Sequence, residues 1–321
     1  MSEAQLPATM TVRAGNTLLQ GMPHLPGSKY ATVRAVLAAA LADGVSKVDG
    51  IALSDDTTVL LRALEQCGVA VEQSGPESIR IHGCAGRFPA PTHGIPVMID
   101  AGNAGAVLRL MLGVAATLPD VRFTTSYMAS LGTRPNADLL DALRLLGVDV
   151  EANGPEGRLP ITLRGSGLHG GTVTIAGARS SQYLSALLFL APLIDEDVTI
   201  AVAGTLASAG FVRLTLATLA QAGITVEYDD ALLRFHISAG QHYQPREWQL
   251  PRDDPSAATW LAAGSVAGGV LTLEGLATAS PEGESILAAL KAMGADIAAT
   301  TEADPALHTL TVRGTTLHGA V

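Results

Sequence analysis

The most regular pattern of apolar and polar positions in this chain is a leucine-rich amphipathic segment, then a glycine, then a short segment rich in β-branched residues. It occurs four times, with glycines about 70–80 residues apart: Gly68, Gly147, Gly223 and Gly294. A leucine lies four residues before each glycine: Leu64, Leu143, Leu219 and Leu290. The pattern predicts a helix that buries its leucine, a C-terminal glycine with positive φ, and a following strand.

An alanine-rich, apolar segment precedes each of these helices and follows a turn rich in Gly, Ser, Asn or Asp. The turns are residues 26–29, 102–105, 180–182 and 253–256. A short apolar strand separates the two helices, and a hairpin-like pair of strands follows the second. Each unit therefore reads β-α-β-α-β-β, which places the chain in the α/β class. Because the helices are apolar nearly all round, we expect both helices of a unit to be buried beneath sheets.

The repeats predict two domains of unequal size. Residues 25–245 hold three units and form a complete domain. Residues 1–24, with one or two strands in TMTVRAGNTLL, join residues 246–321 in a partial second domain with one unit. Polarity rises over residues 241–248, which indicates the boundary between the third and fourth units.

Composition narrows the class of protein. With 48% apolar and 16% charged residues in 321, the chain is globular, and its net charge of −10 argues against nucleic acid as a partner. The longest apolar run, YLSALLFLAPL, is too short to span a membrane, and the start of the chain lacks a signal-peptide pattern. Cys67 and Cys84 give no disulfide framework, and the eight histidines show no ligand spacing. We therefore expect a cytoplasmic protein with no metal and no cofactor.

The turns before the first helices carry the candidate chemistry. A helix N-terminus presents unpaired N–H groups and a partial positive charge. Lys29 and Arg34 lie in the first turns of one such helix, where a cation is unfavourable unless an anion binds nearby. Each turn alone is also explained as an ordinary helix cap. Several helix N-termini that face one cleft would together form an anion-binding chamber.

Four motifs in this order resemble the 5-enolpyruvylshikimate-3-phosphate (EPSP) synthase family: PGSK followed by Arg34, GNAG followed by Arg109, Arg134-Pro135, and SSQYLSALL. The resemblance runs from about residue 10 to the last residue. It implies an enolpyruvyl-transferase-like inverted α/β fold, with two domains of three β-α-β-α-β-β units each. This chain has four such units in place of the family's six.

The resemblance also implies roles for individual residues. It makes Lys29 the catalytic candidate, contacting both phosphoenolpyruvate and the shikimate ring, and Arg34 a ligand of the ring carboxylate. The remaining ring and phosphate candidates are Tyr30, Arg179, Ser180, Ser181, Gln182 and Ser208. The phosphoenolpyruvate side consists of Asn103, Gly105 and Arg134. For Arg109, a structural ion pair and a site role remain equally open.

Some positions depart from the family pattern. Tyr30 stands where the family usually has Ser, Ser130 where it has Arg, and Ala209-Gly210-Phe211 where it has a Lys-Pro-Tyr-like stretch. The chain also stops at Val321, where in the family the catalytic aspartate and the last two units would follow. We therefore expect a C-terminally truncated, divergent member of the family.

Three functions follow as hypotheses. The first is a repurposed enzyme that binds a shikimate-type ring and acts as a lyase, by elimination or dehydration, with phosphoenolpyruvate binding in doubt. The second is 3-phosphoshikimate 1-carboxyvinyltransferase, a transferase of aromatic amino acid biosynthesis, completed by a separate chain or by oligomerisation. The third is a non-catalytic binding or scaffold protein. In each case the partial domain favours a homo-oligomer or a partner chain that covers it.

Overall fold

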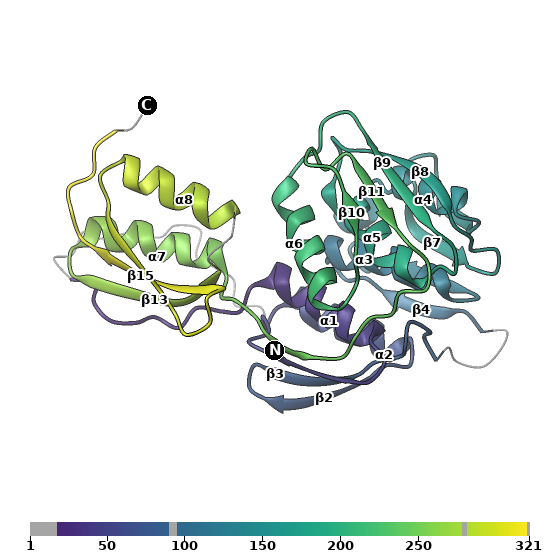
Figure 1. Ribbon diagram of the computed structural model, residues 1–321, viewed down its shortest axis with the longest axis horizontal. Helices are drawn as coiled ribbons and strands as arrows, with labels where there is room; N and C mark the ends of the chain where they lie inside the picture. The colour runs from purple at the N-terminus through teal and green to yellow at the C-terminus, as the bar shows by residue number, and fades with distance from the viewer. Residues whose placement is uncertain (1–17, 90–94, 278–280, 320–321) are drawn as a thin grey trace. The chain divides into compact units, whose positions relative to one another are not determined.

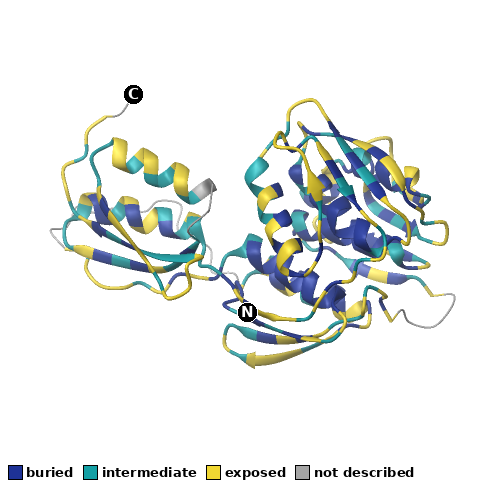
Figure 2. Cartoon of the chain, viewed as in Figure 1, coloured by how far each residue is buried: buried dark blue, intermediate teal, exposed yellow. Residues whose placement is uncertain are grey.

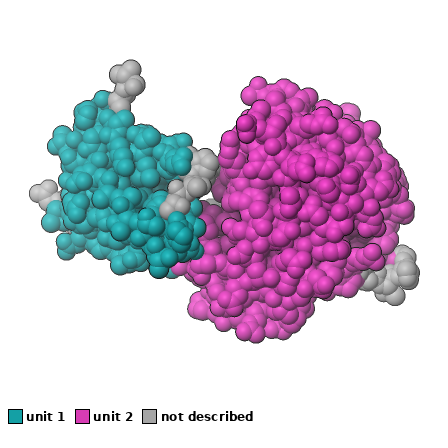
Figure 3. All heavy atoms as spheres, in the orientation of Figure 1, with its two compact units in different colours: residues 1–25, 254–321 teal, residues 26–253 magenta. Residues whose placement is uncertain are grey.

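The computed structural model describes residues 18–89, 95–277 and 281–319. It divides into two compact units, a smaller one of residues 1–25 and 254–321 and a larger one of residues 26–253 (Figure 3). Each unit has its own hydrophobic core. The order of elements along the chain is shown in Figure 1.

The described part of the larger unit contains three groups of elements of the same kind. The first is α1 (Lys29–Leu41), β1 (Val45–Asp49), α2 (Asp55–Gln66), β2 (Ala70–Gly75) and β3 (Ser78–His82). The second is β4 (Val97–Asp100), α3 (Gly105–Val114), β5 (Val121–Thr124), α4 (Ala137–Leu145), β6 (Asp149–Asn153) and β7 (Arg158–Arg164). The third is β8 (Gly171–Ala176), α5 (Ser181–Leu190), β9 (Val198–Ala203), α6 (Ala209–Gln221), β10 (Glu227–Tyr228) and β11 (Arg234–Ile237). Short 3-10 turns follow α3 and α5 and precede α4: η1 (Ala115–Thr117), η3 (Ala191–Leu193) and η2 (Leu131–Thr133).

The sheets of the larger unit share one topology. Their strand orders are β12-β1-β3-β2, β4-β5-β7-β6 and β8-β9-β11-β10. In each sheet the first pair is parallel and the other pairs are antiparallel. The first group lacks a leading strand of its own, and β12 (Glu247–Gln249) takes that position beside β1.

This pairing corrects the expected domain boundary. The sequence placed the boundary after residue 245, whereas the larger unit continues to Asp253. Glu247, Trp248 and Gln249 pair in parallel with residues 47–49 of β1, so they belong to the larger core. The strands expected within residues 1–17 lie outside the described residues, and in the part that is described Gly21 forms a parallel bridge to Leu271.

The smaller unit contains α7 (Asp254–Ala267), β13 (Val270–Ala277), α8 (Pro281–Ala292), β14 (Asp296–Thr301) and β15 (Leu307–Arg313). Its strands form a sheet of order β13-β15-β14, with both pairs antiparallel. Leu261 of α7 packs with Leu273 and Leu310 of this sheet in a small separate core.

The predicted glycine geometry is confirmed. All four glycines after the leucine-rich helices have positive φ: Gly68 +85°, Gly147 +86°, Gly223 +82° and Gly294 +89°. Three of the four leucines are fully buried, namely Leu64, Leu143 and Leu219. The fourth, Leu290 in the smaller unit, is only partly buried. The pattern therefore located the ends of α2, α4, α6 and α8 correctly.

We expected both helices of each β-α-β-α-β-β repeat to be buried. In the larger compact unit this is wrong for the second helix of each repeat. The helices α1, α3 and α5 are buried on almost every side, whereas α2, α4 and α6 expose one face (Figure 2). Small residues let the inner helices pack closely. A Cβ on Gly113 of α3 would lie 2.5 Å from the carbonyl oxygen of Ala186 in α5. The outer helices carry charged residues such as Glu65 and Arg144, which need water.

Both cysteines are free thiols held away from water, and this gives a test of the packing. Burial raises the pKa of Cys67 to about 12 and that of Cys84 to about 11, above the ordinary range of about 8.5. Only the thiolate reacts, and its fraction falls as the pKa rises. At pH 8 we expect Ellman's reagent to label native Cys84 about 10²-fold more slowly than an exposed thiol, and Cys67 more slowly still. Unfolding in urea should bring both to the ordinary rate, and fast labelling of the native protein would contradict this packing.

Among the described residues, no helix is both long enough and apolar enough to cross a membrane.

Candidate functional site

The N-termini of α1 to α6 meet at one end of the larger unit, which the contacts between their first turns establish. On one side, Lys29 Nζ of α1 lies 3.8 Å from Asp56 Oδ2 of α2. The ring of Tyr30 in α1 packs on Phe211 of α6, with centroids 4.6 Å apart. These two contacts connect the first turns of α2, α1 and α6.

The turn before α3 approaches α2, since a Cβ on Gly102 would lie 2.8 Å from Val59 Cγ2, and α3 in turn contacts α5. Arg109 of α3 donates a hydrogen bond of 2.6 Å from Nη1 to Gln182 Oε1 in the first turn of α5. Arg179, just before α5, forms an ion pair of 3.3 Å with Asp138 Oδ2 in the first turn of α4. Because each helix N-terminus presents free N–H groups and a partial positive charge, this end of the unit attracts anions.

The three residues expected on the phosphoenolpyruvate side lie together. A Cβ on Gly105, at the start of α3, would lie 2.8 Å from Arg134 Nη1, so the guanidinium rests directly on this glycine. The neighbouring Asn103 is exposed, and Ala104 caps α3 without a side-chain hydrogen bond. The backbone N–H groups of this turn and the guanidinium are thus available to one anion.

The serine turn, residues 180–182, starts α5. Arg109 separates it from the turn at Gly105. Ser180 is the N-cap residue, and its Oγ accepts a hydrogen bond of 3.3 Å from the Gln182 backbone N–H. Ser181 is buried and Gln182 is half-buried. The adjacent Arg179 is 57% exposed, and its ion pair with Asp138 offsets part of its charge. The added positive charge that the sequence suggested for Arg179 is therefore shared with a carboxylate.

Lys29 and Tyr30 lie at the surface of α1, whereas Arg34 does not. The Lys29 side chain is 40% exposed, and its Nζ lies 5.3 Å from the centroid of the Tyr30 ring. Arg34 is only 4% exposed and donates hydrogen bonds to Thr215 Oγ1, the Tyr30 carbonyl oxygen and the Phe211 carbonyl oxygen. The structure thus places Arg34 between α1 and α6, beneath the surface that Lys29 and Tyr30 occupy.

Ser208 has an unusual backbone for a candidate ligand. It precedes α6 with φ +54° and ψ +51°, the left-handed region that residues other than glycine rarely adopt. Its side chain is exposed and makes no capping hydrogen bond to α6. Its carbonyl oxygen accepts a hydrogen bond of 3.1 Å from the Phe211 backbone N–H. Backbone conformations that cost about 1–3 kcal/mol cluster at binding sites, which keeps Ser208 a candidate ligand.

Sequence reasoning missed two residues that hold the site together. Asn136 is fully buried and donates from Nδ2 to the carbonyl oxygens of Arg134 and Gly157. Tyr183 donates from its hydroxyl to the Pro135 carbonyl oxygen over 2.6 Å. Both lie inside or beside the recognised motifs Arg134-Pro135 and SSQYLSALL, so their proximity to those motifs was the available signal.

One cavity of the larger unit lies away from these residues. It has a volume of about 680 Å³ and is lined by Leu41, Thr117 and Leu193, which end α1, η1 and η3, together with residues of the neighbouring loops. None of the predicted site residues lines it. Helix C-termini carry the negative end of the dipole, so this cavity suits an anion poorly. We assign the candidate site to the N-terminal end on charge and geometry. Among the described residues, no group of three or more His, Cys, Asp or Glu is arranged to hold a metal ion.

Comparison with known proteins defines the family. A family profile described as EPSP synthase (3-phosphoshikimate 1-carboxyvinyltransferase) matches residues 14–318. The chain belongs to this family. The 3-phosphoshikimate 1-carboxyvinyltransferase of Deinococcus radiodurans is 41% identical over 98% of this chain, which spans 68% of that relative. The enzyme of the same name from Burkholderia pseudomallei is 36% identical over 85% of this chain, which spans 59% of it.

The solved structures support the same fold. EPSP synthase from Acinetobacter baumannii superposes with a TM-score of 0.82 at 24% identity, over 95% of this chain and 67% of that one. The EPSP synthase fold and its mixed α/β class are therefore confirmed.

The comparisons correct several expectations. The hypothesis of a repurposed lyase is wrong, because the chain matches 3-phosphoshikimate 1-carboxyvinyltransferases over nearly its whole length. The interpretation of the chain as a truncated, divergent form with four units in place of six is not supported, since 95% of it aligns with a solved EPSP synthase. The need for a partner chain is likewise not supported.

Proposed function

We propose that this chain serves 3-phosphoshikimate 1-carboxyvinyl transfer, in which the enolpyruvyl group of phosphoenolpyruvate passes to shikimate 3-phosphate and phosphate leaves. The observation that carries the proposal is the convergence of the N-termini of α1 to α6, with Lys29, Arg134 and the serine turn among them. Both substrates are anions, and this end of the larger unit concentrates N–H donors and cations in a protein of net charge −10.

Two adjacent subsites divide the roles. The serine turn of Ser180, Ser181 and Gln182, with Ser208, binds the ring and its phosphate through neutral donors at helix starts. Asn103, Gly105 and Arg134 bind phosphoenolpyruvate, whose carboxylate or phosphate matches the guanidinium fork. Arg109 lies between the two subsites.

Lys29 is the acid–base candidate in this proposal. Transfer needs a group to move the proton of the attacking ring hydroxyl or to protonate the methylene carbon of phosphoenolpyruvate. Lys29 begins α1 with its side chain 40% exposed and its Nζ 3.8 Å from Asp56 Oδ2. It can therefore turn from Asp56 toward a substrate without unfolding the helix.

Calorimetry followed by a transfer assay tests the proposal. Shikimate 3-phosphate should bind at least about 10-fold more tightly than shikimate, because a charge-assisted hydrogen bond contributes about 1.5–3 kcal/mol. Phosphate release should then require both shikimate 3-phosphate and phosphoenolpyruvate. Equal affinity for the two shikimate ligands would overturn the assigned phosphate site. Binding without phosphate release would overturn the transfer activity and leave the binding site standing.

A further inference from the structure

Arg109 is a partly buried cation for which the described residues supply no carboxylate partner. Its guanidinium lies 5.1 Å from the centroid of the Tyr183 ring, and among the described residues it forms no ion pair. Burial lowers the pKa of the Arg109 guanidinium, the neighbouring Tyr183 partly offsets this, and the charge of Arg134 adds to the lowering. Holding such a cation beside helix N-termini costs stability unless it serves an anion site.

The hydrogen bonds of Arg109 reach both proposed subsites. Its Nη1 donates to Gln182 Oε1 over 2.6 Å, on the ring side. Its Nε donates to Asn136 Oδ1 over 3.4 Å, and its Nη2 to the Pro135 carbonyl oxygen over 3.5 Å. Asn136 Nδ2 in turn donates a hydrogen bond to the Arg134 carbonyl oxygen, on the phosphoenolpyruvate side. All these partners are neutral, so of the two alternatives left open for Arg109 the structural ion pair is not found among the described residues.

The bond to Gln182 fixes the direction of that side-chain amide. A guanidinium can only donate, so the group that faces it must be the carbonyl Oε1 of Gln182. The amide Nε2 is therefore turned away from Arg109, and no hydrogen bond from it to another described residue is formed. Gln182 thus offers two N–H donors at the start of α5, next to the Ser180 turn.

We propose that Arg109 is a positioning residue that makes Gln182 a hydrogen-bond donor to the ring substrate and, through Asn136, fixes the backbone of Arg134. This inference rests on the proposed function, because it concerns the same two subsites. In this arrangement Gln182 donates a hydrogen bond to an acceptor on the substrate, such as a phosphate or ring oxygen. It does not accept a hydrogen bond from a ring hydroxyl.

A double-mutant cycle tests the coupling, with calorimetric affinity for shikimate 3-phosphate as the readout. Arg109→Gln and Gln182→Ala should each weaken binding about 10-fold. The double variant should be within about two-fold of Gln182→Ala alone, because Arg109 acts through Gln182 and residues in one network are not additive. Additive losses, near 100-fold in the double variant, would overturn the proposal. So would unchanged affinity in Arg109→Gln.

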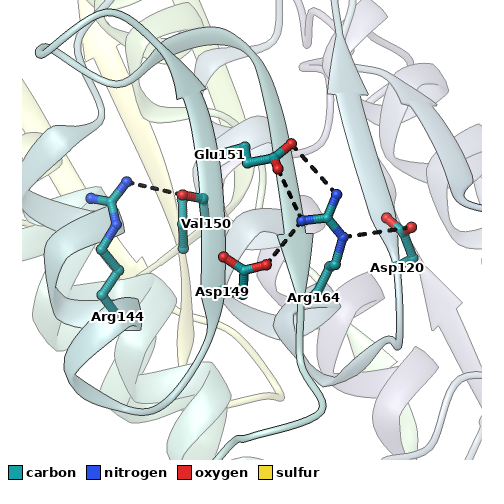
Figure 4. Close-up of polar contacts among 6 residues, drawn as sticks. All are labelled: Asp120, Arg144, Asp149, Val150, Glu151 and Arg164. Carbon is teal, nitrogen blue, oxygen red and sulfur yellow. Dashed lines mark hydrogen bonds and ion pairs between the residues drawn. The ribbon is translucent and has the colours of Figure 1, made fainter.

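Two further variants separate positioning from general stability. Arg109→Lys keeps the charge and one donor but loses the fork, so it should restore part of the Arg109→Gln loss. Arg164→Gln is the matched control, because Arg164 also makes several side-chain hydrogen bonds but lies on the outer strands with Asp149, Glu151 and Asp120 (Figure 4). It should leave the affinity unchanged. A loss in Arg164→Gln as large as in Arg109→Gln would mean that Arg109 acts only through stability.

A ligand-free measurement distinguishes failure of this inference from failure of the proposed function. The side-chain amide of Gln182 should be rigid in ¹⁵N relaxation of the wild-type protein and flexible in Arg109→Gln. If shikimate 3-phosphate does not bind the wild-type protein, the proposed function fails and the relaxation result alone decides the positioning role. An equally mobile Gln182 amide in both proteins would overturn that role.

Discussion

Arg134→Gln is expected to lower the rate of enolpyruvyl transfer by about 10²–10³, the usual cost of removing one preorganised donor from a developing charge. The guanidinium of Arg134 is exposed, rests against Gly105 at the start of α3, and makes no side-chain hydrogen bond to another described residue. It is therefore free to bind an anion. Steady-state phosphate release at saturating shikimate 3-phosphate, with phosphoenolpyruvate varied, measures the effect.

The same variant should keep its stability. A cation at a helix N-terminus is slightly unfavourable, so its removal should leave the melting temperature unchanged or raise it slightly. Arg144→Gln is the control, because Arg144 is an exposed arginine on α4 that pairs with Asp141 and the Val150 carbonyl oxygen, as Figure 4 shows in part. An equal loss of activity in Arg144→Gln, or full activity in Arg134→Gln, would remove Arg134 from the site.

Gly147→Ala is expected to destabilise the larger unit by about 3 kcal/mol, which combines the cost of positive φ with that of overpacking. Gly147 has φ +86°, and a Cβ there would collide with the carbonyl oxygen of Gly167. The nearest neighbour, Gly167, is backbone and cannot move aside cheaply, and the His169 side chain is also close. The free energy of unfolding in urea, measured on the full chain, reports the loss.

Gly154→Ala separates the two contributions. Gly154 has φ +70°, but a Cβ there meets nothing within 4 Å. It should therefore show only the conformational cost, about 1 kcal/mol. Equal losses at Gly147 and Gly154 would show that the close approach to Gly167 contributes nothing.

Local signals in the sequence predicted the ends of helices well, because their cause is local. A glycine with positive φ follows each leucine-rich helix since the turn itself requires it, and Gly68 and Gly223 show this as clearly as Gly147. The distinction between inner and outer helices was harder, because it depends on which faces other elements cover. The position of β12 beside β1 was not predicted, since it joins residues about 200 positions apart.

In the candidate site too, features with a local cause were predicted and features that depend on distant partners were not. Three residues selected from the motifs, Lys29, Gly105 and Gln182, lie at helix starts, and Arg134 contacts Gly105. The burial of Arg34 and the ion pair of Arg179 were not predicted. Both depend on partners from other helices, Thr215 for Arg34 and Asp138 for Arg179. Nothing in the sequence marked Asn136 as a site residue except its position directly after Arg134-Pro135.

Two departures from the family pattern prove to be one local change. Tyr30 and Phe211 were noted separately, one where the family usually has Ser and the other within a Lys-Pro-Tyr-like stretch. In the structure their rings pack on each other at 4.6 Å with an interplanar angle of 54°. A larger ring on α1 is accommodated by its contact on α6. The sequence marked these positions only as departures, and the structure shows that the two side chains pack on each other.

The place of β12 also governs the order in which the protein can assemble during synthesis. The outer edge of β1 has its hydrogen-bond partner in residues 247–249, close to the end of the larger unit. Until the ribosome has released those residues, this edge is open and a ready template for pairing with another chain. Within the larger unit, the first sheet to be translated is therefore the last to be closed. Contacts of such long sequence separation slow folding, so we expect the pairing of β1 with β12 to form late.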